Sequence, residues 1–95
     1  MFIGIMKIQL NFPPVSSIKE KRKIINRIKM KIANRFKVSI AEVDEQDFYN
    51  SSVLGLSFIS NTKNHANSRG QNIVTFLENY ESDVFHNYNL LIEEY

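Results

Sequence analysis

Residues 1–10 form two faces when the chain is read with a period of two. Even-numbered positions carry Phe2, Met6, Ile8 and Leu10, and odd-numbered positions mix apolar and polar residues. This period is typical of a half-buried strand, and it predicts that the even-numbered face belongs to the core. Gly4 lies on that face, where we expect it to let a crossing helix approach closely.

The period changes from two to about 3.6 between residues 17 and 37, as in an amphipathic helix. Ser17 and Glu20 have the spacing of a capping box, which predicts that the helix begins there. The prolines at 13 and 14 end the preceding strand, within a connection that spans residues 11–16. Six large apolar residues share the predicted buried arc of the helix: Ile18, Ile24, Ile25, Ile28, Ile32 and Phe36.

The second half of the chain repeats this alternation of periods. Residues 36–43 predict a strand in which neither face is clearly apolar, as at the edge of a sheet. A polar connection, 44–52, leads to a strand at 53–60 whose larger residues, Leu54, Leu56 and Phe58, are expected in the core. A helix is predicted from residue 61 or 62 to about 80, although Gly70 inside it is a poor helix former. The last strand is predicted at 84–95.

This order of elements predicts an α+β domain with the ferredoxin-like βαββαβ fold over residues 1–95. The four-stranded antiparallel sheet would have the order 4-1-3-2, with both helices on one face. Strands one and two then run in the same direction. We therefore expect the acidic segment after the second strand to lie beside the start of the first helix, and its residues are Glu42, Asp44, Glu45 and Asp47.

Composition limits the class of protein further. The hydrophobic share of 43% indicates a globular chain, and the absence of cysteine excludes disulfides and thiolate metal sites. No apolar run is long enough to span a membrane, and the first ten residues lack the basic start and cleavage site of a signal peptide. We expect a soluble cytoplasmic protein.

Charge is distributed very unevenly, which the net charge of +2 conceals. Nine of the twelve Lys and Arg residues lie between positions 17 and 37, together with one acid, Glu20. A polyanion such as nucleic acid could bind this helix, or the lysines could simply be solvated, or the acidic segment could neutralise them. The candidate nucleic-acid-binding residues are Lys19, Lys21, Arg22, Lys23, Arg27, Lys31 and Arg35.

Catalytic and metal-binding patterns are weak in this chain. His65 and His86 lie on different predicted elements, with His86 expected beside the core, and neither has a nucleophile in a suitable context. The acidic segment does not match the spacing of a calcium-binding loop. We therefore predict no enzyme activity, no metal and no cofactor.

The outer face of the predicted sheet has no aromatic platform on its two central strands, so we do not expect it to stack RNA bases. Its exposed residues include Ile3, Ile5 and Ile59. Such an apolar patch indicates a contact with a partner protein or a homodimer.

Three segments resemble the YlxP-like family of small bacterial proteins of unknown function. They are SSIKEKR at 16–22, NRFKVSIAEVDEQD at 34–47 and LGLSFIS at 54–60. The resemblance implies a ferredoxin-like fold, a bacterial cytoplasmic setting and no catalytic residues. Genes of the family often lie between those for a translation initiation factor and a ribosome-binding factor. The family's recurrent residues correspond here to Ser17, Lys19, Glu20, Lys21, Arg22, Arg35, Glu42, Asp44, Glu45 and Asp47.

Two functions remain open from the sequence. The first is a non-enzymatic accessory protein of translation or ribosome maturation that binds structured RNA or a ribosomal subunit through its basic helix. The second is a protein-interaction module that uses the open face of the sheet and has no role with nucleic acid.

Overall fold

The computed structural model describes residues 1–14 and 17–95 and contains six elements. Residues 15 and 16, in the predicted proline-containing connection and the SSIKEKR motif, lie outside the described residues. Within the described ranges, no helix is both long enough and apolar enough to cross a bilayer. The elements are β1 (Phe2–Asn11), α1 (Ile18–Phe36), β2 (Ser39–Asp44), β3 (Ser51–Ser60), α2 (Lys63–Asn79) and β4 (Phe85–Glu94).

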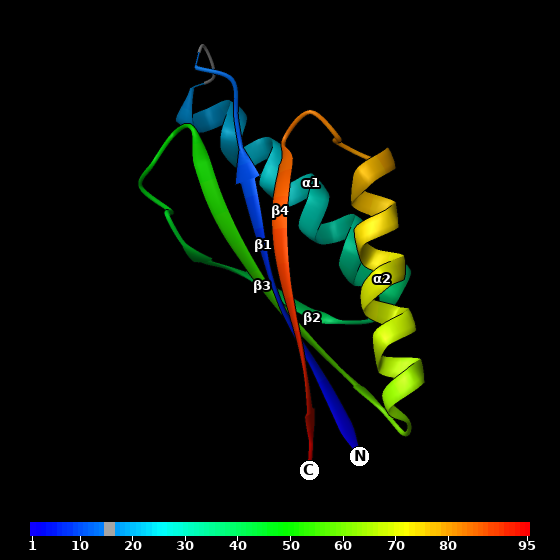
Figure 1. Cartoon of the computed structure of the whole chain (residues 1–95). Coiled ribbons are helices and arrows are strands. Elements are labelled where there is room, and N and C mark those ends of the chain that lie inside the picture. The colour runs from blue at the N-terminus through cyan, green and yellow to red at the C-terminus, as the bar shows by residue number, and fades with distance from the viewer. Residues whose placement is uncertain (15–16) are drawn as a thin grey trace.

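The four strands form one antiparallel sheet with the order β2-β3-β1-β4, and both helices cover the same face (Figure 1). This is the predicted ferredoxin-like arrangement, with the order counted from the opposite edge. The prediction of an edge strand is also confirmed, because within the described residues β2 pairs only with β3. The strand begins at Ser39 and not at the predicted residue 36, because α1 extends to Phe36.

The core lies between the helix-covered face of the sheet and the two helices. In the register of β1 and β3, Met6 pairs with Leu56 and Ile8 with Leu54. Residues that pair across an antiparallel sheet share a face, so these four side chains all point toward the helices. Most of the core set predicted from the sequence is buried, together with residues from α2: Met6, Ile8, Leu10, Ile25, Ile28, Ile32, Leu54, Leu56, Phe58, Ile73 and Leu77. The other predicted core residues, Phe2, Ile18, Ile24 and Phe36, are only partly buried.

A bulge near the end of β2 changes the face on which its side chains lie. Before the bulge, Ile40 pairs with Leu56 and Glu42 with Leu54, so both residues lie on the helix side of the sheet. The register then shifts, because Asp44 pairs with Val53 and leaves Val43 as an extra residue. Asp44 therefore lies on the open face, whereas the carboxylate of Glu42 lies on the helix side, 3.6 Å from Nζ of Lys21 near the start of α1.

A second bulge corrects the expectation for His86. Gln9 of β1 pairs with Asn87, whereas Leu10 pairs with Phe85, so His86 is the extra residue of the bulge. It is exposed rather than beside the core. The prediction treated residues 84–95 as an unbroken strand with a period of two. One inserted residue reverses the face of the strand residues that precede it.

Both helices begin at the residues that the sequence indicates. The Ser17 hydroxyl accepts a hydrogen bond from the Glu20 amide at 3.1 Å, and the Thr62 hydroxyl accepts one from the His65 amide at 3.1 Å. At the other end of α1, Lys37 is left-handed with φ of 55° and donates its amide to the Ala33 carbonyl. Local capping therefore fixes the length of α1.

Gly4 and Gly70 are needed for packing, although the expected role of Gly4 was wrong. A Cβ atom at Gly4 would lie 2.2 Å from Cζ of Phe58, so the neighbouring strand, not a helix, fills that space. A Cβ atom at Gly70 would lie 2.5 Å from Cδ2 of Leu90. The absence of a side chain at Gly70 therefore lets α2 pack closely on β4, which accounts for a poor helix former inside the helix.

We expect Gly4→Ala to lower the free energy of unfolding by about 1–3 kcal/mol, because the new methyl group collides with a buried ring. Urea denaturation measures this loss. Removing the ring should remove the collision, so Gly4→Ala should cost clearly less in a Phe58→Leu background than in the parent protein. Equal losses in the two backgrounds would show that Phe58 is not the cause.

Candidate functional site

Lys21 lies in the first turns of α1 on the same face as the apolar core. It precedes Ile25, Ile28 and Ile32 by four, seven and eleven residues, which is the spacing of one helical face. Its side chain is only 1% exposed. The sequence therefore contained a signal for this burial, since Lys21 continues the isoleucine stripe by one more turn.

The ammonium group of Lys21 is held by oxygens from β2 and from the loop that follows it. Nζ donates hydrogen bonds to the carbonyls of Glu45 at 2.8 Å, Gln46 at 3.3 Å and Phe48. The carboxylate of Glu42 lies 3.6 Å away and also accepts a hydrogen bond of 2.6 Å from the buried hydroxyl of Ser52. All three protons of the ammonium group therefore have acceptors, and its charge has a counterion.

This geometry corrects one predicted binding residue and answers one open question. Lys21 cannot belong to an exposed nucleic-acid-binding surface, because the loop covers it. The acidic segment does contact the first helix, but it does so through Glu42 and through backbone carbonyls. The Glu45 carboxylate instead accepts a hydrogen bond from Gln9 at 3.2 Å, and Asp44 and Asp47 are exposed.

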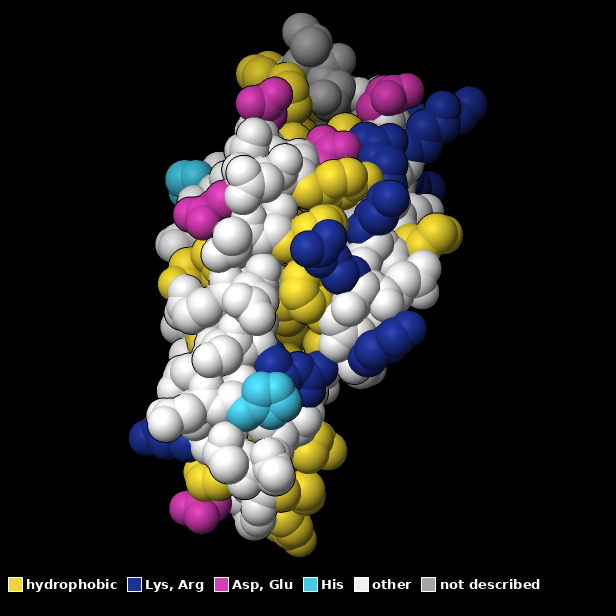
Figure 2. Space-filling model, turned by 90° about the vertical axis from the view of Figure 1, so that its right-hand side faces the viewer, with side chains coloured by type: hydrophobic (Ala, Val, Ile, Leu, Met, Phe, Trp, Pro, Cys, Tyr) yellow, Lys and Arg dark blue, Asp and Glu magenta, His cyan; other side chains and the backbone are white. Residues whose placement is uncertain are grey.

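The other predicted basic residues do lie on the outer side of α1. Figure 2 shows Lys and Arg side chains gathered along one side of the molecule, next to a hollow that contains apolar side chains. Within the described residues, Arg27 is the only one of them that makes an ion pair. The side chains predicted correctly to be exposed are Lys19, Arg22, Lys23, Arg27, Lys31 and Arg35.

Arg27 is joined to the segment that follows α2. Its Nε and Nη2 atoms donate to Oε1 of Glu81 at 3.1 and 2.5 Å. This hydrogen bonding, together with the negative charge of Glu81, raises the pKa of Arg27 above its ordinary value, so the guanidinium stays charged. The remaining exposed candidates fall into two groups on either side of Arg27. Lys19, Arg22 and Lys23 lie near the start of α1, and Lys31 and Arg35 lie near its end.

The group near the end of α1 borders a groove between the two helices that the sequence analysis missed. Phe76 and Tyr80 of α2 stack with ring centres 5.1 Å apart, and the guanidinium of Arg35 lies 5.2 Å from the centre of the Phe76 ring. Lys31 lies 6.0 Å from the Tyr80 ring. Depressions of about 510 and 480 Å³ open beside these residues. The apolar arc of each helix predicts which of its own residues are buried, but it does not predict which residues line the space between the two helices.

The histidines do not form a site with other candidate groups. His65 and His86 are both exposed, on α2 and β4. Across residues 1–14 and 17–95, no three His, Asp or Glu side chains come close enough together to hold a metal ion.

The fold and the basic face together define a small α+β domain of the ferredoxin-like class with one cationic helix. Residues 3–89 match the model of a family described as a protein of unknown function (DUF503). The chain belongs to this family, as the resemblance noted in the sequence implied. Its sequence is similar to the uncharacterized protein YlxP of Bacillus subtilis, with 27% identity over 78 residues, 82% of this chain and 85% of that protein.

Solved structures support the fold alone. A protein of unknown function from Nitrosomonas europaea aligns with a TM-score of 0.56 and 11% identity, over 100% of this chain and 90% of its own. The 30S ribosomal protein S6 from Thermotoga maritima aligns with a TM-score of 0.51 and 13% identity, over 96% of this chain and 88% of its own. The designed protein Foldit4 aligns with a TM-score of 0.55 and 9% identity, over 99% of this chain and 97% of its own. Such low identities carry no information about function.

We expect Lys21→Met to lower the free energy of unfolding by about 3 kcal/mol, because it leaves the Glu42 carboxylate, which is 20% exposed, without a counterion and removes the donor to three loop carbonyls. Lys23→Met is the matched control: the same substitution two residues away, on the exposed side, should change stability by less than about 0.5 kcal/mol. Urea denaturation compares the two variants.

Hydrogen exchange gives a second measurement of the same contact. In Lys21→Met, amides of residues 45–50 should exchange faster, while those in the centre of β1 should change only with global stability. Equal unfolding free energies for Lys21→Met and Lys23→Met would contradict the structural role of Lys21.

Proposed function

We propose that this protein is a non-enzymatic accessory protein of the bacterial cytoplasm that docks on structured RNA, in particular ribosomal RNA, through α1. The observation that carries the proposal is a helix with many exposed cations and almost no acids. Among the described residues, only Lys21 and Arg27 of its basic side chains have a carboxylate partner within the chain. The exposed cations would then contact the phosphate backbone.

The start of α1 is the strongest part of this surface for binding an anion. Lys19, Arg22 and Lys23 lie in the first two turns, where the amides and dipole of the helix already carry partial positive charge. Like charges four residues apart destabilise a helix by about 0.2–0.5 kcal/mol per pair. A phosphate bound there relieves the repulsion and also interacts favourably with the helix dipole.

The geometry favours contact with phosphates over reading of bases. A helix of 19 residues is roughly 28 Å long, so its two basic groups can reach phosphates well separated along an RNA surface. The two central strands carry no aromatic residue on the open face, where this fold stacks single-stranded bases in other proteins. We therefore expect binding that depends on shape and salt, with little dependence on sequence.

Removing one phosphate contact should reduce the salt dependence of RNA binding. Lys23→Gln should lower the slope of log K against log salt concentration by about 0.9, and Lys19→Gln with Lys23→Gln by about twice that value. Co-sedimentation with ribosomal subunits, or anisotropy with a labelled ribosomal RNA fragment, across a salt series measures this slope.

Lys63→Gln is the matched control, since Lys63 is an exposed lysine at the start of α2. It removes the same charge and should leave the slope unchanged. If the Lys63 and Lys23 variants behave alike, binding reports overall charge only, and the proposed docking surface on α1 is wrong. If the parent protein does not bind ribosomal RNA even at low salt, the proposed function is wrong.

A further inference from the structure

The face of the sheet that the helices leave uncovered carries several large apolar side chains. Ile59 of β3 is 60% exposed, Ile5 of β1 is 42% exposed and Leu91 of β4 is 49% exposed. Val43, the bulged residue of β2, is 49% exposed. One face of an antiparallel sheet can be solvated, but it then usually carries polar residues. A group of branched aliphatic side chains here indicates an interface.

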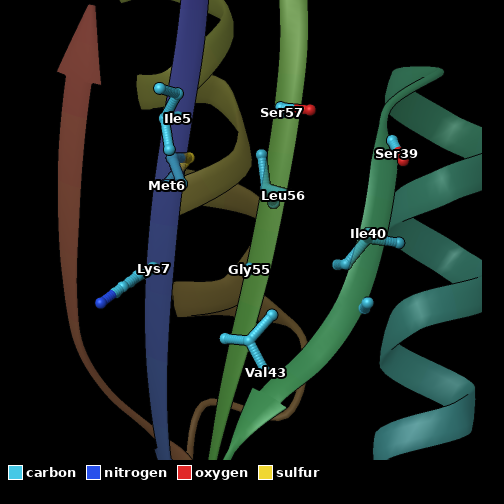
Figure 3. Close-up of a pocket in the computed structure, with 10 residues that line it drawn as sticks. Ile5, Met6, Lys7, Ser39, Ile40, Val43, Gly55, Leu56 and Ser57 are labelled. Atoms are coloured by element: carbon cyan, nitrogen blue, oxygen red, sulfur yellow. The ribbon is translucent and has the colours of Figure 1, made fainter.

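This face has a hollow as well as projections. Gly55 has no side chain, and the Val43 side chain lies over it, because a Cβ atom at Gly55 would come within 2.9 Å of Cγ1 of Val43 (Figure 3). Ile5 and Ser57 line the open face next to them. The resulting depression has a volume of about 350 Å³. Ile59 lies on the same strand as Gly55, four residues further on, which places a protruding side chain two positions along this face from the hollow.

Two opposite charges lie on either side of the apolar centre. The centre is the row across the sheet formed by Ser57, Ile5 and Leu91, in which Ile5 pairs with Ser57 on one side and with Leu91 on the other. Lys7 lies one row to one side of it, and Glu93 lies one row to the other side. Within the part of the chain that the structure describes, neither of them makes an ion pair.

We propose that a second copy of this chain covers the open face, with a two-fold axis that runs across the strands along the Ser57–Ile5–Leu91 row. Such an axis places each strand opposite the same strand of the partner, running in the reverse direction. A residue one row above the axis then faces a residue one row below it. The surface must therefore be complementary to itself across this row.

Two pairs of features meet this condition. Ile59 and Gly55 lie on β3 in the rows on either side of the axis, so each Ile59 side chain would face the partner's Gly55 and contact the Val43 side chain that lies over it. Lys7 and Glu93 also lie in opposite rows, but on the adjacent strands β1 and β4, so they are diagonal neighbours across the interface and the residue directly opposite Lys7 is the partner's Ile3. In Figure 3 the Lys7 side chain points away from β3 toward β4, which is the direction of the partner's Glu93 in this arrangement.

The size of the face agrees with this occupant. Three strands of ten residues and one of six, at about 3.3 Å per residue and about 4.8 Å apart, give roughly 570 Å² per copy. Stable interfaces bury about 800 ± 200 Å² per partner, so the whole face is needed. A partner of another kind would have to supply both the projection and both charges, whereas a second copy carries them already.

The dimer is independent of the proposed RNA-binding function, because α1 lies on the opposite face of the sheet (Figure 1). Salt-dependent RNA binding tests one proposal, and the mass of the protein in solution tests the other. Either can fail without the other.

Sedimentation velocity from the micromolar to the millimolar range tests the dimer. The parent should sediment with twice the chain mass of 11.1 kDa, and Ile5→Asp should sediment as a folded monomer. Met30→Asp is the control, since Met30 is exposed on α1 and its substitution should leave the dimer intact. A parent protein that stays monomeric over the whole concentration range overturns the proposal, even if the open face binds a different protein.

A charge exchange tests the two-fold arrangement itself. Lys7→Glu and Glu93→Lys should each weaken the dimer by about tenfold, because each places like charges at diagonally adjacent positions of the interface, and the two-fold axis repeats this repulsion twice. The double variant restores opposite charges and should recover most of the affinity. Single variants with unchanged affinity, or a double variant as weak as the single ones, would overturn the arrangement.

Discussion

The buried ammonium group of Lys21 holds together the start of α1, the end of β2 and the loop that follows β2. A lysine in a core position is unfavourable unless its charge and all its protons are satisfied, and here both come from β2 and the loop after it. The SSIKEKR segment and the AEVDEQD segment are far apart in the sequence, yet Lys21 joins them. Two motifs that the sequence presents as a basic one and an acidic one therefore form a single structural unit.

Arg69 makes comparable contacts with backbone carbonyls at the C-terminal end of α1. Arg69 of α2 donates to the carbonyls of Phe36 at 2.8 Å and Ile59 at 2.9 Å, and its guanidinium lies 4.6 Å from the centre of the Phe58 ring. The carbonyls at a helix C-terminus are its negative end, so a cation is favourable there. Lys21 and Arg69 thus hold the two ends of α1 against the sheet. Among the basic residues, Lys21 is buried and Arg69 is partly buried, and both have structural roles, whereas the exposed lysines and arginines of α1 are available for binding.

Sequence periods predict this fold well because burial repeats along each element. The alternation in β1 and β3 and the isoleucine stripe of α1 were sufficient for the element order, the sheet order and most of the core. The bulges at Val43 and His86 were not predictable in this way, since one extra residue reverses the face of a strand without changing its composition. Lys21 was misassigned because residue type outweighed position: its spacing belonged to the core, although its charge suggested the surface. The interhelical groove depends on how two helices cross, which neither helix encodes alone.

The two proposed surfaces lie on opposite sides of the sheet, and this separation constrains how they would work together. If the open faces pair about the proposed axis, the sheets lie between the two copies and both α1 helices point outward, away from each other. One flat RNA surface could then contact only one helix at a time. Two helices could bind the same RNA only if it folds around the dimer or if two segments approach from opposite sides. A gain in affinity on dimerisation would therefore report the shape of the RNA, because avidity is lost when geometry forbids simultaneous contact.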